Sequence, residues 1–268
     1  MKVVREAKEA IVSSIAVFCD EALTLLNKSD NLKTAMALLG SLIVLNVAYC
    51  VLYQVLLGLK TFVLPRVLGL IRDPALKTRY GPWALVTGCT RGIGREYAMA
   101  LGKHGINVVL VSRNKQKLDN VANELRDSFK VDTMTVVADF SNPETISKAI
   151  KKVKSANIEL GILINNVGVL GPSHLPFLEL DKTSVKEIIL INTLPMTMFT
   201  HAFLPEMVTK GRGAIINISS VAGIWPMPYL AVYSATKHYA TSFTKAIATE
   251  YNNSGVVIQE VEICTRLA

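Results

Sequence analysis

The sequence predicts an α/β fold in which a doubly wound parallel sheet of about six strands follows one N-terminal transmembrane helix. Three observations lead to this prediction. From Trp83 onward, short apolar runs alternate with helix-like stretches, which is the pattern of repeated βαβ units. A glycine-rich segment, Gly88–Gly94, follows the first apolar run, where a strand is expected to turn into a helix. Before this domain, the 25 residues Ala35–Leu59 carry no charged side chain.

These patterns divide the chain into four parts. They are an amphipathic segment at 1–33, the transmembrane helix at 34–60, an interfacial linker at 61–80 and the sheet domain at 81–268. In the sheet domain we expect strands over 84–87, 107–112, 133–138, 160–165, 214–219 and 256–263. We expect helices from the glycine-rich segment to 104 and over 115–129, 141–155, 184–207 and 233–252. The third helix is expected to start with a capping box in which Ser141 is the N-cap and Glu144 the reciprocal residue.

The uncharged segment Ala35–Leu59 is long enough to cross a bilayer, because about 20 apolar residues span the hydrocarbon core as a helix. A buried core helix is the alternative, but the Leu, Ile, Val and Ala composition, with two tyrosines toward one end, favours a membrane. Lysine and arginine number two in residues 20–34 and five in residues 60–79, so the positive-inside rule places the sheet domain in the cytosol. The apolar run 62–71 is short and interrupted, and we expect it to lie in the membrane interface.

Composition argues against several classes of function. The formal charge is +8, but lysine and arginine are spread along the chain rather than gathered with aromatic residues, so nucleic acid is not an expected partner. The four cysteines are scattered and form no CxxC pair, which indicates a reducing compartment with neither a disulfide framework nor a zinc site. No histidine has a second ligand type at metal-binding spacing, so no metal is expected. The mean hydropathy of +0.36 agrees with an apolar segment outside the sheet domain.

The glycine-rich segment has the spacing of a dinucleotide site. It reads Thr87-Gly88-x-x-x-Gly92-Ile93-Gly94 and stands between an expected strand and an expected helix. Glycines there let the backbone approach a pyrophosphate, whose negative charge is favoured at the helix N-terminus. The sequence therefore predicts a Rossmann-type sheet that binds a dinucleotide cofactor.

The residues around the second expected strand indicate which dinucleotide is bound. A fold that prefers NAD usually ends this strand with an acidic residue that binds the ribose 2′-hydroxyl. Here the turn reads Ser112-Arg113-Asn114, and Arg91 lies inside the glycine-rich segment. Two guanidinium groups can bind a 2′-phosphate through charge-assisted hydrogen bonds, which favours NADP(H). The alternative is that Arg113 is an ordinary solvated turn residue.

A candidate catalytic group follows the fifth expected strand. Tyr233 and Lys237 are four residues apart and so share one face of a helix, and Ser220 lies thirteen residues before the tyrosine. A free tyrosine has a pKa of about 10, and a nearby ammonium lowers that pKa, which suits acid–base chemistry on an alcohol or ketone. A serine hydroxyl could hold the substrate oxygen beside the phenol. Taken alone, the pair could also be a surface Tyr/Lys pair on an amphipathic helix.

Together, the glycine-rich segment and Ser220, Tyr233 and Lys237 resemble the short-chain dehydrogenase/reductase family, and the resemblance covers Trp83 to about Ile263. It implies further site residues. Asn192 would be the fourth catalytic residue, ordering a water in a proton relay. Asp139 would contact the adenine amino group; the alternative is that it is an ordinary turn aspartate. Asn166 and Gly168, in Asn165-Asn166-Val167-Gly168, would line the cofactor pocket, as would Ile93; Tyr233 and Lys237 would contact the cofactor as well.

Within this family, the chain resembles the membrane-bound reductases of very-long-chain 3-oxoacyl-CoA and of 17-beta-hydroxysteroids, a group that includes nematode steroid-dehydrogenase-like proteins. The resemblance rests on the Asn-Asn-Val-Gly motif, the apolar N-terminal segment and the Tyr-Gly-Pro-Trp sequence before the first strand. It implies an NADPH-dependent reduction of a ketone to a secondary alcohol, with a long-chain 3-oxoacyl-CoA of fatty acid elongation as the preferred substrate. A steroid ketone is the alternative. It also implies a single-pass protein of the endoplasmic reticulum membrane with a cytosolic catalytic domain.

The C-terminal residues depart from the family pattern. The family follows its sixth strand with a proline-led loop that holds the nicotinamide carboxamide, then a seventh strand and a substrate lid. Here the chain reads Glu262-Ile-Cys-Thr-Arg-Leu-Ala268, with Ile263 near the position of that proline. The expectation is a C-terminally incomplete reductase domain whose open sheet edge offers a surface for pairing with a second copy. A catalytically inactive, membrane-anchored family member is the competing hypothesis.

Overall fold

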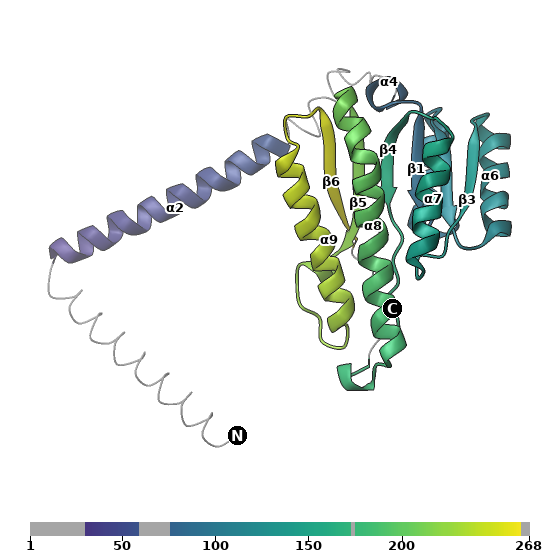
Figure 1. Cartoon of the computed structure of the whole chain (residues 1–268). Helices are drawn as coiled ribbons and strands as arrows, with labels where there is room; N and C mark the ends of the chain where they lie inside the picture. Colours follow the sequence, from purple (N-terminus) through teal and green to yellow (C-terminus); the bar gives the residue numbers. More distant parts are fainter. Residues whose placement is uncertain (1–29, 59–75, 173–174, 264–268) are drawn as a thin grey trace. The chain divides into compact units, whose positions relative to one another are not determined.

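The computed structural model describes residues 30–58, 76–172 and 175–263 (Figure 1). The chain forms two units, Met1–Arg72 and Asp73–Ala268, and each is described by itself. The amphipathic segment predicted at 1–33 lies almost wholly outside the described residues, as does the interfacial run 62–71.

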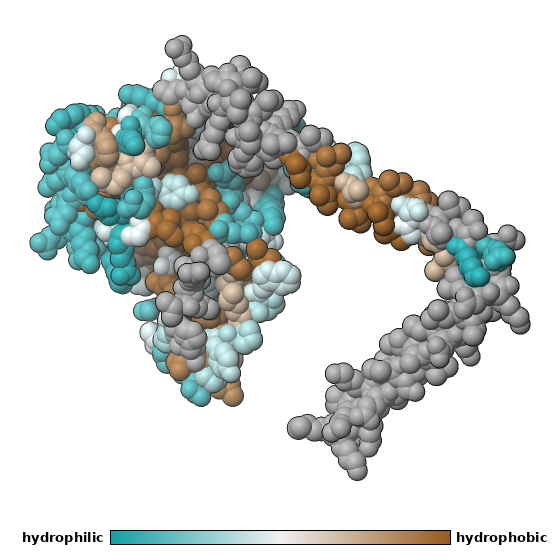
Figure 2. Space-filling model, turned by 180° about the vertical axis from the view of Figure 1, so that it is seen from behind, coloured by the Kyte–Doolittle hydropathy of each residue, from teal (hydrophilic) through white to brown (hydrophobic). Residues whose placement is uncertain are grey.

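In the first unit, the described residues form one helix, α2, over Asp30–Gly58, which confirms the helix predicted there. After Lys33 the helix carries no charged residue. Its described apolar side chains are exposed on all sides, and Figure 2 shows them covering the visible face of the helix. A helix that is apolar all round belongs in a protein core or in a bilayer.

Membrane insertion of α2 stays a prediction. Among the described residues, the helix that combines the length and hydropathy of a membrane span is Lys182–Lys210, and half of its apolar window is buried, as in a core helix of the second unit. In α2 the corresponding apolar stretch is shorter, Leu39–Val55.

The second unit is a six-stranded sheet in which every neighbouring pair is parallel, and its strand order is β3-β2-β1-β4-β5-β6. The strands are β1 Trp83–Thr87, β2 Asn107–Ser112, β3 Thr133–Val137, β4 Leu160–Asn165, β5 Gly213–Ser220 and β6 Val256–Ile263. The order reverses between β1 and β4, which is the switch point where doubly wound sheets bind ligands. The predicted Rossmann-type topology is therefore confirmed.

Helices cover both faces of this sheet. They are α4 Leu76–Tyr80, α5 Gly92–Lys103, α6 Lys115–Phe129, α7 Pro143–Ser155, α8 Lys182–Lys210 and α9 Ala231–Glu250, with 3-10 turns η2 Phe177–Glu179 and η3 Val221–Gly223. In Figure 1, α7, α8 and α9 lie on one face, and the core beneath α7 and α8 includes Leu85, Ile146 and Phe199. The other core includes Val86 with residues of α5 and α6. Leu85 and Val86 are consecutive, so they point to opposite faces, and both are fully buried.

The predicted N-cap of α7 is wrong. The N-cap of α7 is Asn142, whose Oδ1 accepts a hydrogen bond from the Glu144 N–H at 2.9 Å. Ser141, the predicted N-cap, instead donates its hydroxyl and its backbone N–H to Asp139 Oδ1, at 2.8 and 3.0 Å. Asn is as good an N-cap as Ser, and Pro143 suits the first helical position, so the cap lies one residue later than predicted.

Candidate active site

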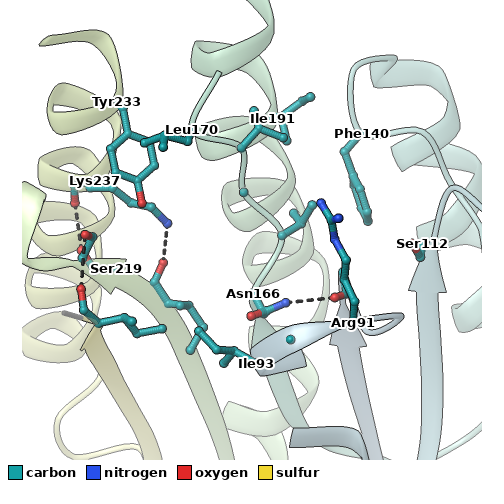
Figure 3. Close-up of a pocket in the computed structure, with 18 of the residues that line it drawn as sticks. Arg91, Ile93, Ser112, Phe140, Asn166, Leu170, Ile191, Ser219, Tyr233 and Lys237 are labelled. Carbon is teal, nitrogen blue, oxygen red and sulfur yellow. Dashed lines mark hydrogen bonds between the residues drawn. The ribbon is translucent and has the colours of Figure 1, made fainter. Parts of the chain in front are cut away.

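A cavity of about 720 Å³ opens at the carboxyl ends of the strands, where the segments that follow each parallel strand meet (Figure 3). Most predicted site residues line it: Gly88, Arg91, Gly92, Ile93, Arg113, Asp139, Asn166, Gly168, Ser220, Tyr233 and Lys237. Gly94 and Asn192 are not part of the lining, but both lie against residues that are. The sheet thus brings together segments from the whole length of the second unit.

The glycine-rich turn after β1 has the backbone shape that a bound pyrophosphate requires. Gly88 and Gly92 have φ angles of +66° and +55°, a region that side chains disfavour. A Cβ on Gly94 would collide with Asn166 Nδ2 and with the carbonyl oxygen of Gly88. The first turn of α5 therefore packs directly on the ends of β1 and β4. Its N-cap, Arg91, makes no side-chain capping bond, and the N–H groups of such a helix N-terminus favour an anion.

Asn166 ties the ends of β1 and β4 together. Its Nδ2 donates to the carbonyl oxygens of Thr87 and Gly88, at 2.9 and 3.2 Å (Figure 3 shows one of these bonds). The Thr87 hydroxyl in turn accepts hydrogen bonds from the backbone N–H groups of Asn166 and Val167, at 3.0 and 3.1 Å. These bonds hold the floor of the cavity at the switch point.

Cationic side chains surround the end of the cavity next to β2 and β3. Arg91 and Arg113 line it as predicted, and so does Lys117, whose N–H donates to Asn114 Oδ1 at the start of α6. Asp139 faces the same end. The hydrogen bonds from Ser141 hold the pKa of Asp139 below its ordinary value, and the nearby Arg113 contributes in the same direction, so this carboxylate is ionised at neutral pH.

The other end of the cavity is formed by α9, which carries Tyr233 and Lys237 one turn apart (Figure 3). The Lys237 side chain is buried, its Nζ donates to the carbonyl oxygen of Ile218 at 2.9 Å, and it lies 5.7 Å from the centroid of the Tyr233 ring. Ser220 closes β5 beside them; its hydroxyl accepts from the Ala222 N–H at 3.2 Å and donates to the Ile263 carbonyl at 3.3 Å. The predicted serine, tyrosine and lysine therefore do converge on one cavity.

The pKa values of this pair depart from the expectation based on spacing. Burial lowers the pKa of Lys237 to about 8. Burial also raises the pKa of Tyr233 above its ordinary value, while a hydrogen bond with Ser220 acts in the opposite direction. Lys237 was expected to lower the phenol pKa, but in this structure its Nζ is bonded to a backbone carbonyl, and desolvation of the phenol has the larger effect.

Asn192 joins three segments behind the catalytic side chains. Its Oδ1 accepts from the Val169 N–H at 2.8 Å, and its Nδ2 donates to the Val169 carbonyl at 2.9 Å and to Thr236 Oγ1 at 3.0 Å. A Cβ placed on Gly168 would lie 3.4 Å from both Asn192 Oδ1 and Lys237 Nζ. Asn192 thus connects α8 to the segment after β4 and to α9.

Several lining residues escaped the sequence reasoning. Phe140 and Lys117 line the cavity, and so do Met227 and Leu230 near Tyr233. Ile263 lines it as well, but the sequence had placed it near the proline of the family's nicotinamide loop. Phe140 follows Asp139 just after β3, so the rule that ligands bind at the carboxyl ends of parallel strands could have identified it. The other residues carry no motif, and their place in the cavity depends on how the segments fold over it.

A doubly wound sheet whose switch point carries a glycine cradle, cations and a Ser/Tyr/Lys group defines a dinucleotide-dependent oxidoreductase domain. The family described as short chain dehydrogenase matches residues 82–265, most of this domain. The chain belongs to the short-chain dehydrogenase/reductase family.

Curated relatives refine this placement. The chain is 41% identical over 208 residues to the very-long-chain 3-oxoacyl-CoA reductase of Homo sapiens, which covers 76% of this chain and 66% of the relative. It is 36% identical over 236 residues to hydroxysteroid dehydrogenase-like protein 1 of Gallus gallus, which covers 87% of this chain and 70% of the relative. The predicted similarity to this group is confirmed, and the chain spans about two thirds of the length of these relatives.

Solved structures of the family share the fold. A short-chain dehydrogenase from Sphingobium yanoikuyae in complex with NADPH has a TM-score of 0.63 and 34% identity, over 68% of this chain and 70% of that chain. A metagenomic short-chain oxidoreductase in complex with NADP has a TM-score of 0.65 and 31% identity, over 70% of this chain and 83% of that chain. Relatives of this fold therefore bind NADP(H).

Proposed function

We propose that this chain is an NADPH-dependent reductase that converts the 3-oxo group of a long-chain acyl-CoA into a secondary alcohol, a step of fatty acid elongation. The observation that carries the proposal is the convergence of Ser220, Tyr233 and Lys237 at one end of a cavity whose other end holds a glycine cradle and cations. The substrate class is supported by identities of about 40% to the very-long-chain 3-oxoacyl-CoA reductases.

The residues present fit NADPH. Gly88, Gly92 and the first turn of α5 would hold the pyrophosphate, since their backbone leaves room for it and offers N–H groups to its charge. Arg91 and Arg113 would bind the 2′-phosphate. No acidic residue ends β2, where it would instead bind the ribose 2′-hydroxyl of NAD. When bound, the cofactor supplies the hydride that reaches the carbonyl carbon.

The chain's own residues would manage the carbonyl oxygen. The Ser220 hydroxyl would turn from the Ile263 carbonyl, donate its one proton to that oxygen and fix its position beside the phenol. Tyr233 would then give its proton to the oxygen as negative charge develops there; its raised pKa keeps the phenol protonated, the form that a reduction needs. The Lys237 ammonium, protonated below a pH of about 8, would bind the nicotinamide ribose and stabilise the resulting phenolate. Asn192 would hold the Val169 backbone and α9 in place around them.

A substrate comparison tests this proposal. The full chain, purified in detergent micelles, is given NADPH with a long-chain 3-oxoacyl-CoA or with a 17-ketosteroid, and NADPH oxidation is followed. We expect kcat/KM to favour the acyl-CoA by at least tenfold. A preference for the steroid would favour the second candidate, which rests on the similarity to hydroxysteroid dehydrogenase-like protein 1 across 87% of this chain. Turnover of neither substrate would contradict the proposal.

We also propose that α2 anchors the chain in the endoplasmic reticulum membrane with the catalytic domain in the cytosol. Support comes from a helix without charge after Lys33 and from the excess of lysine and arginine in residues 60–79 over residues 20–34. We expect the protein to stay in the membrane pellet after alkaline carbonate extraction and its sheet domain to be digested by protease added outside intact microsomes. Release by carbonate, or protection of the sheet domain, would contradict this.

A further inference from the structure

Consecutive residues at the end of β5 hold Lys237 at both of its ends. The carbonyl oxygen of Ile218 accepts from Lys237 Nζ at 2.9 Å, and the hydroxyl of the next residue, Ser219, donates to the Lys237 backbone carbonyl at 3.1 Å (Figure 3). The following residue is Ser220, the last residue of β5 and one of the three candidate catalytic residues. One short stretch of strand therefore sets the backbone of Lys237, its ammonium and the serine hydroxyl together.

The hydroxyl of Ser219 donates its one proton to the Lys237 carbonyl. Its side chain is 2% exposed, so water does not compete for it. A serine has one hydroxyl proton, and the Lys237 carbonyl can only accept, so that proton goes to Lys237. The second contact of Ser219, to Thr241 Oγ1 at 3.0 Å, must then be donated by Thr241. The Thr241 hydroxyl bonds Ser219, whereas its backbone N–H is the ordinary helical donor to the Lys237 carbonyl and stays in place in Thr241→Val, which makes that variant a matched control.

The same peptide is held from another side by η3. A Cβ built on Gly223 would lie 2.8 Å from both the carbonyl carbon and the carbonyl oxygen of Lys237, which are backbone atoms that cannot move aside alone. The Gly223 carbonyl also lies 2.9 Å from His238 Nδ1, which must be the donor because the carbonyl accepts. The Ser219 hydroxyl and the backbone at Gly223 therefore both lie against the Lys237 carbonyl.

We propose that Ser219 is a positioning residue for Lys237: its buried hydroxyl fixes α9 against β5, so that the ammonium and the Tyr233 phenol stay aligned within the cavity. The inference rests on the role given to Lys237 in the proposed function. The physical reason for this role is that the lysine ammonium sits on a flexible four-carbon side chain. Such a side chain keeps one geometry only if its backbone is held in place as well. A displacement of about 1 Å in a reacting group can lower a rate by roughly 100-fold.

The test compares Ser219→Ala with Thr241→Val in the full chain. Affinity for NADPH is measured by fluorescence as a function of pH, together with kcat for the ketone and the melting temperature. In the wild type, NADPH affinity should fall as the pH rises through about 8, where the buried Lys237 loses its charge. Tyr233 is the titratable group beside Lys237; Glu260 of β6 pairs with Lys245, two turns further along α9.

We expect Ser219→Ala to lower kcat roughly ten- to 100-fold and to move the midpoint of NADPH binding upward by about half a unit or more, because a loosened ammonium regains water. Thr241→Val should lose a similar amount of melting temperature but keep the wild-type midpoint and kcat. Equal behaviour of the two variants, or a wild-type midpoint in Ser219→Ala, would overturn the inference. So would an NADPH affinity that does not depend on pH near 8 in the wild type.

Two further arms keep the test decisive. If Ser219→Ala does not fold, Gly223→Ala displaces the same Lys237 peptide and should shift the same midpoint; an unshifted midpoint there would contradict the positioning of Lys237 through its backbone. If the wild type binds NADPH but reduces neither ketone, the proposed function fails while the binding midpoint still decides the role of Ser219. If the wild type reduces a ketone and Ser219→Ala does so at the same rate, the proposed function stands and only the positioning role of Ser219 fails.

Discussion

At the scale of single residues, the proposed chemistry depends on a buried charge. Lys237 is 6% exposed, with one hydrogen bond from its Nζ to the Ile218 carbonyl, and burial lowers its pKa to about 8. Keeping an ammonium in such a place costs stability, because little of its hydration is replaced. Its retention in the cavity therefore indicates a functional role rather than a contribution to folding.

The variant Lys237→Met should separate these two effects. A solvated lysine has a pKa of 10.5, so between pH 8 and 10.5 the unfolded chain binds more protons than the folded chain. The destabilising effect of Lys237 is therefore complete below about pH 8 and disappears as the pH rises toward 10.5. We expect Lys237→Met to lose turnover yet melt at a higher temperature than the wild type at pH 7, with a gain that shrinks toward pH 10. A gain that grew with pH would contradict the assigned direction of the shift.

A second residue-scale prediction concerns Arg113. Its guanidinium is expected to bind the 2′-phosphate, and a hydrogen bond to a charged group contributes about 1.5–3 kcal/mol. Arg113→Ala should therefore raise the Kd of NADPH about tenfold or more while changing the Kd of NADH little, as measured by fluorescence titration. Arg126→Ala is the matched control, because Arg126 lies on α6 and bonds Thr133 at 2.7 Å. An equal loss for both dinucleotides would argue against a 2′-phosphate contact.

At the scale of elements, the start of α5 determines the shape of the cofactor site. Gly94 brings this helix into direct contact with Asn166 and with the Gly88 carbonyl, so the pyrophosphate cradle and the sheet are held together by close backbone packing. Any side chain at this position must push the helix away from β1 and β4. The N–H groups of its first turn would then no longer point at the position expected for the pyrophosphate.

We expect Gly94→Ala to lower stability by about 1–3 kcal/mol and to weaken NADPH binding, because overpacking forces backbone shifts. Urea unfolding and fluorescence titration would measure the two effects. Gly40→Ala in α2 is a suitable control, since a Cβ there meets nothing within 4 Å and alanine favours a helix. If Gly94→Ala bound NADPH with wild-type affinity, the cradle would not depend on this close approach.

Elements of the sheet could be predicted from the sequence nearly residue by residue. The strand β4 was predicted at 160–165 and β2 at 107–112, as observed, because strands buried on both faces are continuous apolar runs bounded by polar residues. Helix ends were less accurate. The cap of α7 moved from Ser141 to Asn142, and α8 begins at Lys182 rather than Ser184, because several neighbouring residues can cap a helix equally well.

The site could be predicted where a motif marks it and not where burial decides. Tyr233 and Lys237 were expected on one helix face, and the structure places them there. The direction of the Tyr233 pKa shift was missed, because spacing along a helix says nothing about how deeply a phenol is buried. Lys117 was missed for a related reason: its place in the cavity depends on how α6 packs beside the glycine-rich turn.

At the scale of the whole second unit, the parallel sheet makes one cavity from two halves of the sequence. In the proposed function, β1 to β3 supply the cofactor end, with Gly88, Arg113 and Asp139, and β4 to β6 supply the substrate end, with Ser220 and Tyr233. In the proposed reaction, Tyr233 delivers a proton to a ketone oxygen in a cavity that also binds NADPH.

The most direct test is the rate of NADPH oxidation by Tyr233→Phe with a saturating long-chain 3-oxoacyl-CoA. Phenylalanine keeps the ring and removes only the proton donor, so the NADPH Kd, measured on the same sample, should stay within about twofold of the wild type. General acid catalysis contributes about 10²–10⁴-fold, and we expect kcat to fall by at least about 100-fold. A Tyr233→Phe variant that binds NADPH and turns over at the wild-type rate would contradict the account.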